Sequence, residues 1–288
     1  MNAHPTTISL QIMTLMKISR HVFAAMVGLG MAGAVMASSP SADTLKAAIA
    51  SDKRTPAYVQ RDAARHPYET LSFFGIKPTM TVVELSPGGG WYTEIIAPYL
   101  KDKGHYIAAA YGETSPTEYR RGYTENFKKK LAADPARFGK VQLAVFEPPN
   151  DLSYAQPGSA DLVLTFRNLH NWLSYGDENM RRVFQSVYAT LKPGGVFGVV
   201  EHRLPETMPQ DATASSGYMH ESYVIDMAKS VGFELAETSE INANPKDTAD
   251  HPNGVWALPP TYRNKDQDRD RYEAIGESDR MTLKFVKP

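Results

Sequence analysis

Strand and helix patterns alternate along most of this 288-residue chain, and this alternation limits its fold more than any other feature. Helical spacing of apolar residues is clear over 178–191 and again from Glu221 to a stop at Gly232. Such alternation predicts an α/β fold with a doubly wound, mostly parallel sheet covered by helices on both faces. The expected strands are short apolar segments at Thr81–Leu85, His105–Ala110, Val141–Phe146, Ala160–Phe166, Val196–Glu201, Phe233–Thr238 and Met281–Val286.

The N-terminus is typical of a secretory signal peptide. Lys17 and Arg20 precede a short apolar run over 22–35, and the small residues up to Ala37 predict cleavage after that residue. The run is too short for an ordinary membrane span. We therefore expect a periplasmic or secreted protein, with a buried N-terminal helix or a retained anchor as the alternatives. The initiating residue is left open among Met1, Met13 and Met16.

Composition excludes several functional classes. The chain has no cysteine, which rules out thiol catalysis and thiolate metal ligands. Its formal net charge of -1 lacks the basic excess that nucleic-acid binding selects. We expect a small-molecule substrate, no nucleic acid and no stable membrane span after signal cleavage. The sequence does not specify an oligomeric state.

A glycine-rich turn follows the first predicted strand in "VVELSPGGGW". In a doubly wound sheet the first strand-to-helix turn is a common binding place for anionic ligand groups. The dinucleotide pattern G-x-G-x-x-G fails because Thr93 stands at its last position, and no phosphate-binding Gly-Lys-Ser/Thr string occurs. Two interpretations remain, a turn that holds another cofactor and a tight turn that needs glycine for its backbone alone.

The turn resembles the first motif of the class I S-adenosylmethionine-dependent methyltransferases. That motif has an acid, one residue and then Gly-x-Gly-x-Gly, and here Ser86 takes the first glycine position. "SADLVLTFRNLHNW", "LKPGGVFGVVEH" and "SDRMTLKFVKP" resemble the fourth, fifth and seventh strands of the family. With the leader, the chain resembles a group of predicted secreted or periplasmic methyltransferases. The resemblance implies a Rossmann-like, seven-stranded methyltransferase domain over 75–288, after a linker and helices over 38–74 and a signal peptide over 1–37.

The resemblance also implies S-adenosylmethionine as the cofactor. The family carries an acid after the second strand for the ribose hydroxyls, whereas residues 109–111 of this chain are Ala, Ala and Tyr. After the third strand, Glu147 is expected at the adenine amino group, with Asp151 as the second choice. The methionine end is expected to meet Glu84, Ser86, Gly88, Gly89 and Gly90.

The acceptor side is expected at the carboxyl ends of the later strands, where open parallel sheets bind ligands. Asn168 is expected in the cofactor and acceptor region, and His170, His202 and His220 are the candidate catalytic residues because methyl transfer to a hydroxyl or amine benefits from a base. Alternatively, Asn168 caps a turn and His170 hydrogen-bonds the backbone. No histidine and carboxylate spacing matches a known ligand string, so no metal site is predicted.

These observations predict an exported enzyme that uses S-adenosylmethionine to methylate a small molecule. The missing ribose acid and the export signal favour an alternative, a non-enzymatic periplasmic small-molecule-binding protein on the same fold. A third interpretation is a metal-dependent hydrolase that uses His202 and His220.

Overall fold

The structure is a computed structural model that describes residues 40–288. The predicted signal peptide and its cleavage site therefore lie outside the described residues. Among the helices of the described part, none is both long and apolar enough to cross a membrane.

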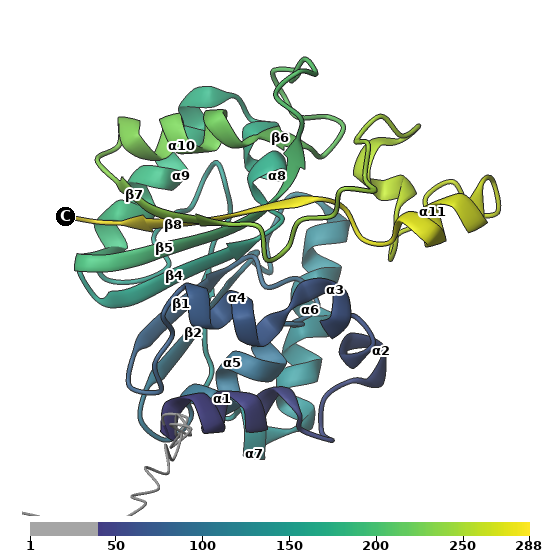
Figure 1. Cartoon of the computed structure of the whole chain (residues 1–288). Helices are drawn as coiled ribbons and strands as arrows, with labels where there is room; N and C mark the ends of the chain where they lie inside the picture. Colours follow the sequence, from purple (N-terminus) through teal and green to yellow (C-terminus); the bar gives the residue numbers. More distant parts are fainter. Residues whose placement is uncertain (1–39) are drawn as a thin grey trace, which may run out of the picture. The chain divides into compact units, whose positions relative to one another are not determined.

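The main sheet has the strand order β3-β2-β1-β4-β5-β8-β7 (Figure 1), which confirms the predicted doubly wound α/β fold. Strands β1 to β5 run parallel to one another, and β8 runs antiparallel to both β5 and β7. A short strand, β6, pairs with the end of β5. The strands are β1 Thr81–Leu85, β2 His105–Ala110, β3 Gln142–Val145, β4 Ala160–Phe166, β5 Leu191–Leu204, β6 Met219–His220, β7 Glu234–Ser239 and β8 Arg280–Val286.

Helices cover both faces of this sheet (Figure 1). Before β1 the chain forms α1 Pro40–Ile49, α2 Pro56–Val59, α3 Asp62–Arg65 and α4 Pro67–Phe73. The later helices are α5 Thr93–Leu100, α6 Glu118–Ala133, α7 Pro135–Phe138, α8 Leu169–Leu173, α9 Asp177–Thr190, α10 Glu221–Ser230, the 3-10 helix η1 Gly254–Ala257 and α11 Arg269–Ile275. The predicted helices over 178–191 and from Glu221 are confirmed as α9 and α10.

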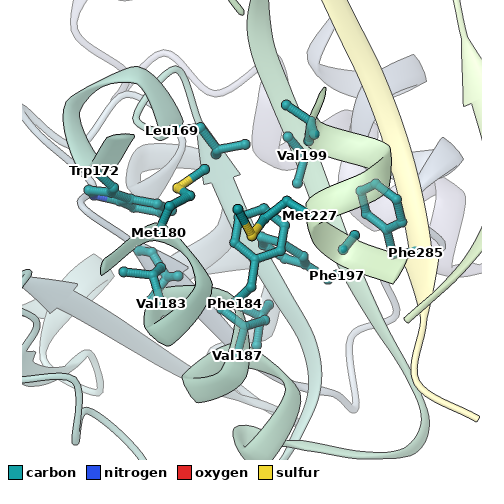
Figure 2. Packing of buried hydrophobic residues seen from close by; sticks show 14 of the residues in the cluster. Leu169, Trp172, Met180, Val183, Phe184, Val187, Phe197, Val199, Met227 and Phe285 are labelled. Atoms are coloured by element: carbon teal, nitrogen blue, oxygen red, sulfur yellow. The ribbon is translucent and has the colours of Figure 1, made fainter. Parts of the chain in front are cut away.

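Each face of the sheet packs against its own apolar layer, because successive side chains of a strand point to opposite faces. Val83 and Leu85 of β1 belong to the layer under α8, α9 and α10, whereas Val82 belongs to the layer under α1, α4 and α5. Figure 2 shows part of the first layer, with Leu169 of α8, Met180 of α9 and Met227 of α10. Both layers are buried, so the strands read as nearly continuous apolar runs.

Strand β5 begins earlier than the pattern predicted. The sequence predicted Val196 as its first residue, yet the strand begins at Leu191. Leu191 pairs with Ala160 and Val196 pairs with Leu162, so β5 carries extra residues that form a bulge. Gly194, at φ 74°, supplies the left-handed conformation within it.

The polar stretch over 242–280 forms η1, α11 and their connecting loops. Part of it lies beside the carboxyl ends of β1, β4 and β5, where a cavity is lined by Val255, Trp256, Pro259, Pro260, Thr261, Arg263, Glu277 and Ser278 of this stretch. The second polar stretch, over 112–140, folds into α6 and α7.

Candidate functional site

A cavity of about 610 Å³ opens where the parallel strands end. This volume lies within the range of small-molecule sites. Its walls come from the glycine turn after β1, the segment after β4, the end of β5, the N-terminal helices and the 255–263 loop. The cavity therefore occupies the point where the strand order reverses between β1 and β4, as expected for a ligand site of this fold.

Two residues at this point have left-handed backbones. Ser86, directly after β1, has φ 52°, and Arg167, directly after β4, has φ 63°. Their N–H groups extend the ladders by donating to Ala109 O at 2.8 Å and Val200 O at 2.7 Å. A left-handed non-glycine residue costs about 1–2 kcal/mol, and such strain gathers at functional sites.

Glu84 is a buried carboxylate on the cavity wall. It accepts a hydrogen bond from the Thr93 hydroxyl at 3.3 Å and a short one from the Tyr106 hydroxyl. Burial raises the pKa of Glu84 to about 7, against the lowering effect of these two donors. A ligand cation beside Glu84 would favour its charged form.

The glycines of the turn serve different purposes. Gly88 has φ 57°, and a Cβ atom added to it would meet open space. At Gly90, with φ 81°, an added Cβ would lie 2.8 Å from a ring atom of Phe127 in α6. Gly90 is thus needed for packing, whereas Gly88 leaves room on the cavity side that a ligand backbone contact can use.

The end of the cavity at which the sequence predicted a nucleoside differs from the pattern of the family that the sequence resembles. Tyr111 lines the cavity where the ribose acid was expected, and the Arg120 guanidinium lies 4.7 Å from the centre of its ring. Glu147 is buried but does not line the cavity. Its oxygens accept from Gly112 N at 3.0 Å, from Ser115 Oγ at 2.9 Å and from Arg120. The residues present therefore fit the methionine end of S-adenosylmethionine, while a phenol replaces a carboxylate at the other end.

His170 and Glu201 form a buried pair. His170 Nδ1 lies 3.0 Å from Glu201 Oε1, and the Leu169 N–H donates to Glu201 Oε2 at 2.5 Å. In a neutral imidazole, a proton on Nδ1 would be donated to this carboxylate, and Nε2 would then be the accepting nitrogen. His170 also lines the cavity, so the geometry suits a base that a carboxylate orients.

His202 lies beside this pair, with its ring centre 5.5 Å from that of His170. Its Nδ1 contacts Ser278 Oγ at 2.5 Å. Burial, helped by neighbouring positive charge, holds the pKa of His202 well below its usual range, so its imidazole is neutral. His170, Glu201 and His202 each offer a ligand atom within 4.8 Å of the others. The Glu201 oxygens are already engaged by His170, the Leu169 N–H and the His202 N–H.

Two further expected residues have structural partners. Asn168 contacts the cavity, and its amide nitrogen donates to Phe166 O at 3.2 Å and Leu85 O at 3.3 Å, which ties the β4 loop to the glycine turn. His220 does not line the cavity, and its Nε2 contacts Met208 O at 2.8 Å.

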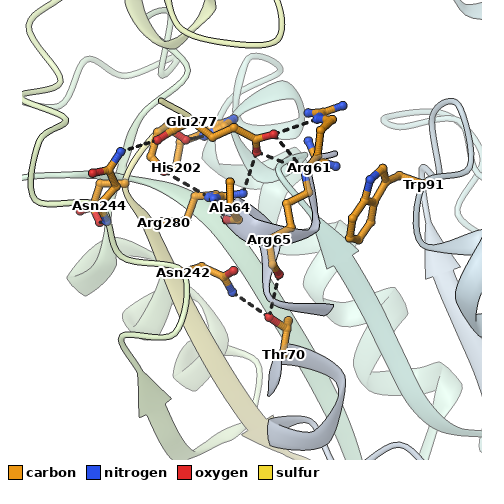
Figure 3. Close-up of polar contacts among 12 residues, drawn as sticks. Arg61, Ala64, Arg65, Thr70, Trp91, His202, Asn242, Asn244, Glu277 and Arg280 are labelled. Atoms are coloured by element: carbon orange, nitrogen blue, oxygen red, sulfur yellow. Dashed lines mark hydrogen bonds and ion pairs between the residues drawn. The ribbon is translucent and has the colours of Figure 1, made fainter. Parts of the chain in front are cut away.

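The cavity also contains a cluster that the sequence analysis missed. Arg61 and Arg65 reach Glu277 from the N-terminal helices, and Arg280 of β8 contacts the same carboxylate (Figure 3). Arg61 and Glu277 are 216 residues apart in sequence. No local pattern links such positions. The role of Glu201 as the partner of His170 depends on the pairing of β4 with β5, which no local sequence pattern shows.

Comparisons with solved structures agree with this fold. A methyltransferase from Aquifex aeolicus that depends on S-adenosylmethionine matches with a TM-score of 0.50 at 15% identity, over 70% of this chain and 93% of that chain. A protein assigned as a sarcosine dimethylglycine methyltransferase from Galdieria sulphuraria matches with a TM-score of 0.55 at 13% identity, over 82% and 89%. The (4+2)-cyclase SpnF matches with a TM-score of 0.53 at 13% identity, over 86% and 93%.

No protein-family model and no curated protein matches the chain. At these identities the structural likeness concerns the fold alone. The sheet is that of the Rossmann-like methyltransferases, and the chemistry has to be argued from the site.

Proposed function

We propose that this chain is an S-adenosylmethionine-dependent methyltransferase that acts on a small molecule. The observation that carries the proposal is the pairing of a buried carboxylate, Glu84, with the open glycine turn at Gly88 on one wall of the cavity. An ammonium group and a carboxylate, as in the methionine end of the cofactor, suit such a wall.

In this proposal Glu84 holds the cofactor's ammonium group, and the backbone of Ser86, Gly88 and Gly89 accommodates its carboxylate. When bound, the cofactor supplies an electrophilic methyl group. Tyr111 and Asn168 flank its nucleoside and its reacting end, and Glu147 supports the β2 loop from behind by holding Arg120.

His170 is the proposed base. Its Nε2 takes the proton of an acceptor hydroxyl or amine as the acceptor gains the methyl group, and Glu201 stabilises the imidazolium that results. His202 stays neutral and limits the acceptor's approach. Most of the rate is expected from positioning, because methyl transfer requires an in-line approach.

The test is a calorimetric titration of S-adenosylmethionine and S-adenosylhomocysteine into the full chain. We expect micromolar dissociation constants, about -8 kcal/mol. Glu84→Gln keeps the side chain's shape and removes its charge, so it should weaken binding of both ligands by at least about tenfold. Glu178→Gln, an exposed change on α9, is the matched control and should bind as the wild type does. No heat at millimolar ligand would overturn the proposal.

A second function is favoured by one observation. The Glu147 carboxylate is engaged by Arg120 and two other donors, and residues 109–111 at the end of β2 are Ala, Ala and Tyr, so the expected nucleoside end lacks the carboxylates that the family resemblance implies. A non-enzymatic small-molecule-binding protein on this fold would not need carboxylates at that end of the cavity. SpnF, a cyclase, matches the same fold, so the fold alone does not require methyl transfer. Absence of cofactor binding together with tight binding of another small molecule would favour this alternative.

We further propose that the protein is exported. The support is the basic and apolar N-terminal sequence ahead of Ala37. Mass spectrometry of the protein purified from its native cells should give Ser38 as the first residue, whereas an intact N-terminus would contradict export by cleavage.

A further inference from the structure

Positive charge is in excess on one side of the cavity. Glu277 accepts from Arg61 Nε at 2.8 Å, from Arg65 Nε at 3.0 Å and from Arg280 Nη1 at 3.0 Å (Figure 3). The side chains of Arg65, Arg280 and Glu277 are nearly buried. A single carboxylate thus faces three guanidinium groups in a region with little water to screen them.

Arg167 adds a further cation to the same cavity wall. Within residues 40–288 its guanidinium has no hydrogen bond and no ion-pair partner. Burial, with repulsion from Arg280 and Arg61, lowers the pKa of Arg167 to about 10, although Glu277 acts in the opposite direction. Arg167 is half-buried, so its guanidinium is partly removed from water with no carboxylate of the described part in direct contact, which is unfavourable unless a ligand supplies the opposite charge.

A second observation comes from Arg65. Its Nη2 atom is buried and has no hydrogen-bond partner among the described residues. The guanidinium carbon of Arg65 lies 4.9 Å from the centre of the Trp91 ring, which covers one side of the group. Buried donors are nearly always paired in folded proteins, so this wall lacks an acceptor.

The location of Arg167 limits what that acceptor is. Arg167 follows β4 in a left-handed conformation, three residues before His170 of α8, and both residues line the cavity. The planar guanidinium binds carboxylate and phosphate groups through two parallel hydrogen bonds. Tyr92, Phe166 and Trp256 add aromatic surface to the cavity.

We propose that Arg167 binds an anionic group of the methyl acceptor, and that the acceptor is a small, partly apolar molecule bearing a carboxylate or a phosphate. This inference rests on the proposed methyltransferase function. Arg61 and Arg65 strengthen the site through the excess charge that Glu277 leaves uncompensated. The same chemistry occurs in the cofactor's own carboxylate, so the experiment has to separate the two sources.

The experiment titrates benzoate, phenyl phosphate and the neutral analogue benzamide into the full chain, with and without saturating S-adenosylhomocysteine. We expect both anions to bind in the presence of S-adenosylhomocysteine, and benzamide to bind at least about tenfold more weakly. Arg167→Gln should lower the affinity for benzoate at least about tenfold. Arg167→Lys keeps the charge without the planar group, so its affinity for benzoate should lie between those of the wild type and Arg167→Gln. Arg182→Gln, which removes an exposed charge on α9, is the matched control and should leave benzoate binding unchanged.

Several results would overturn the inference. Displacement of benzoate by S-adenosylhomocysteine would assign Arg167 to the cofactor's carboxylate instead. Equal binding of benzamide and benzoate by the wild type, which needs no variant to fold, would show that no anion is recognised. Benzoate binding that depends on Arg167 in a protein that does not bind S-adenosylhomocysteine would support the anion site and contradict the proposed methyltransferase function.

Discussion

His170 Nδ1 lies 3.0 Å from the fully buried carboxylate of Glu201. His170 belongs to α8, which follows β4, and Glu201 belongs to β5, the strand that pairs with β4. Glu201 also accepts from the backbone N–H groups of Leu169 and His202. Its two oxygens thus fix both the ring of His170 and the start of α8, which makes the candidate base part of the folded core.

Glu201→Gln should destabilise the fold. The substitution replaces one carboxylate oxygen with an amide nitrogen, which cannot accept a hydrogen bond. This nitrogen then faces either the N–H of Leu169 or the His202 N–H, and a buried donor is left unpaired. We expect a loss of about 1–3 kcal/mol in the free energy of unfolding, measured by urea denaturation. Glu234→Gln, an exposed change on β7, should stay within about 0.5 kcal/mol of the wild type. Equal stability of Glu201→Gln and the wild type would contradict the hydrogen bonding described here.

Glu84 should make stability fall as the pH rises. Its pKa in the folded protein is about 7, against 4.5 for an ordinary glutamate. A raised carboxyl pKa means that the folded state holds the proton more tightly, so its stabilising effect is complete below pH 4.5 and is lost as the pH rises through 7. The loss is about 3 kcal/mol. Glu84→Gln cannot ionise, so its stability relative to the wild type should increase by this order between pH 4.5 and 8, as measured by denaturation at each pH.

The same carboxyl should link cofactor binding to protons. An ammonium group beside Glu84 favours its charged form, so binding below pH 7 releases a proton. Calorimetric titrations of S-adenosylhomocysteine at pH 6 in buffers of different ionisation enthalpy should therefore give different observed heats. Glu84→Gln removes the titrating group, and heats that vary equally with buffer in both proteins would assign the proton to another site.

Gly88→Ala and Gly90→Ala should separate binding from packing. At Gly88 the added Cβ meets open space, so the cost is the left-handed backbone alone, about 1 kcal/mol, while cofactor binding should fall at least about tenfold. At Gly90 the Cβ would lie 2.8 Å from Phe127, and overpacking adds to the backbone cost, for about 2–4 kcal/mol in total. Thermal unfolding and S-adenosylhomocysteine titration measure the two effects. Unchanged binding by a folded Gly88→Ala protein would mean that the turn holds no ligand.

Glu147→Gln tests whether that residue meets the adenine or supports the loop from behind. The structure shows its carboxylate bound to Gly112 N, Ser115 and Arg120, outside the cavity wall. We expect the free energy of unfolding to fall by about 1–3 kcal/mol and the affinity for adenosine to change little. A large loss of adenosine affinity at unchanged stability would support the direct adenine contact that the family resemblance implies.

The strands and the glycine turn could be predicted from the sequence because their signals are local. Alternating or continuous apolar residues give the strands, and glycine marks a turn wherever the backbone needs a positive φ. β2 and β4 begin and end at the predicted residues. The first residue of β5 could not be predicted from local signals, because the strand starts where Leu191 pairs with Ala160 of β4.

The sequence by itself determined the order of the elements, the position of the glycine turn and the presence of Glu84 and His170 at strand ends. Only the tertiary structure decided what these residues contact. Arg120 and Glu147 form an ion pair outside the cavity wall, while Arg61 and Arg65 contact Glu277 from the opposite end of the chain. The physical reason is that the strength of an interaction between charged groups depends on their distance and their burial in the folded structure. Spacing along the sequence sets neither the distance nor the burial.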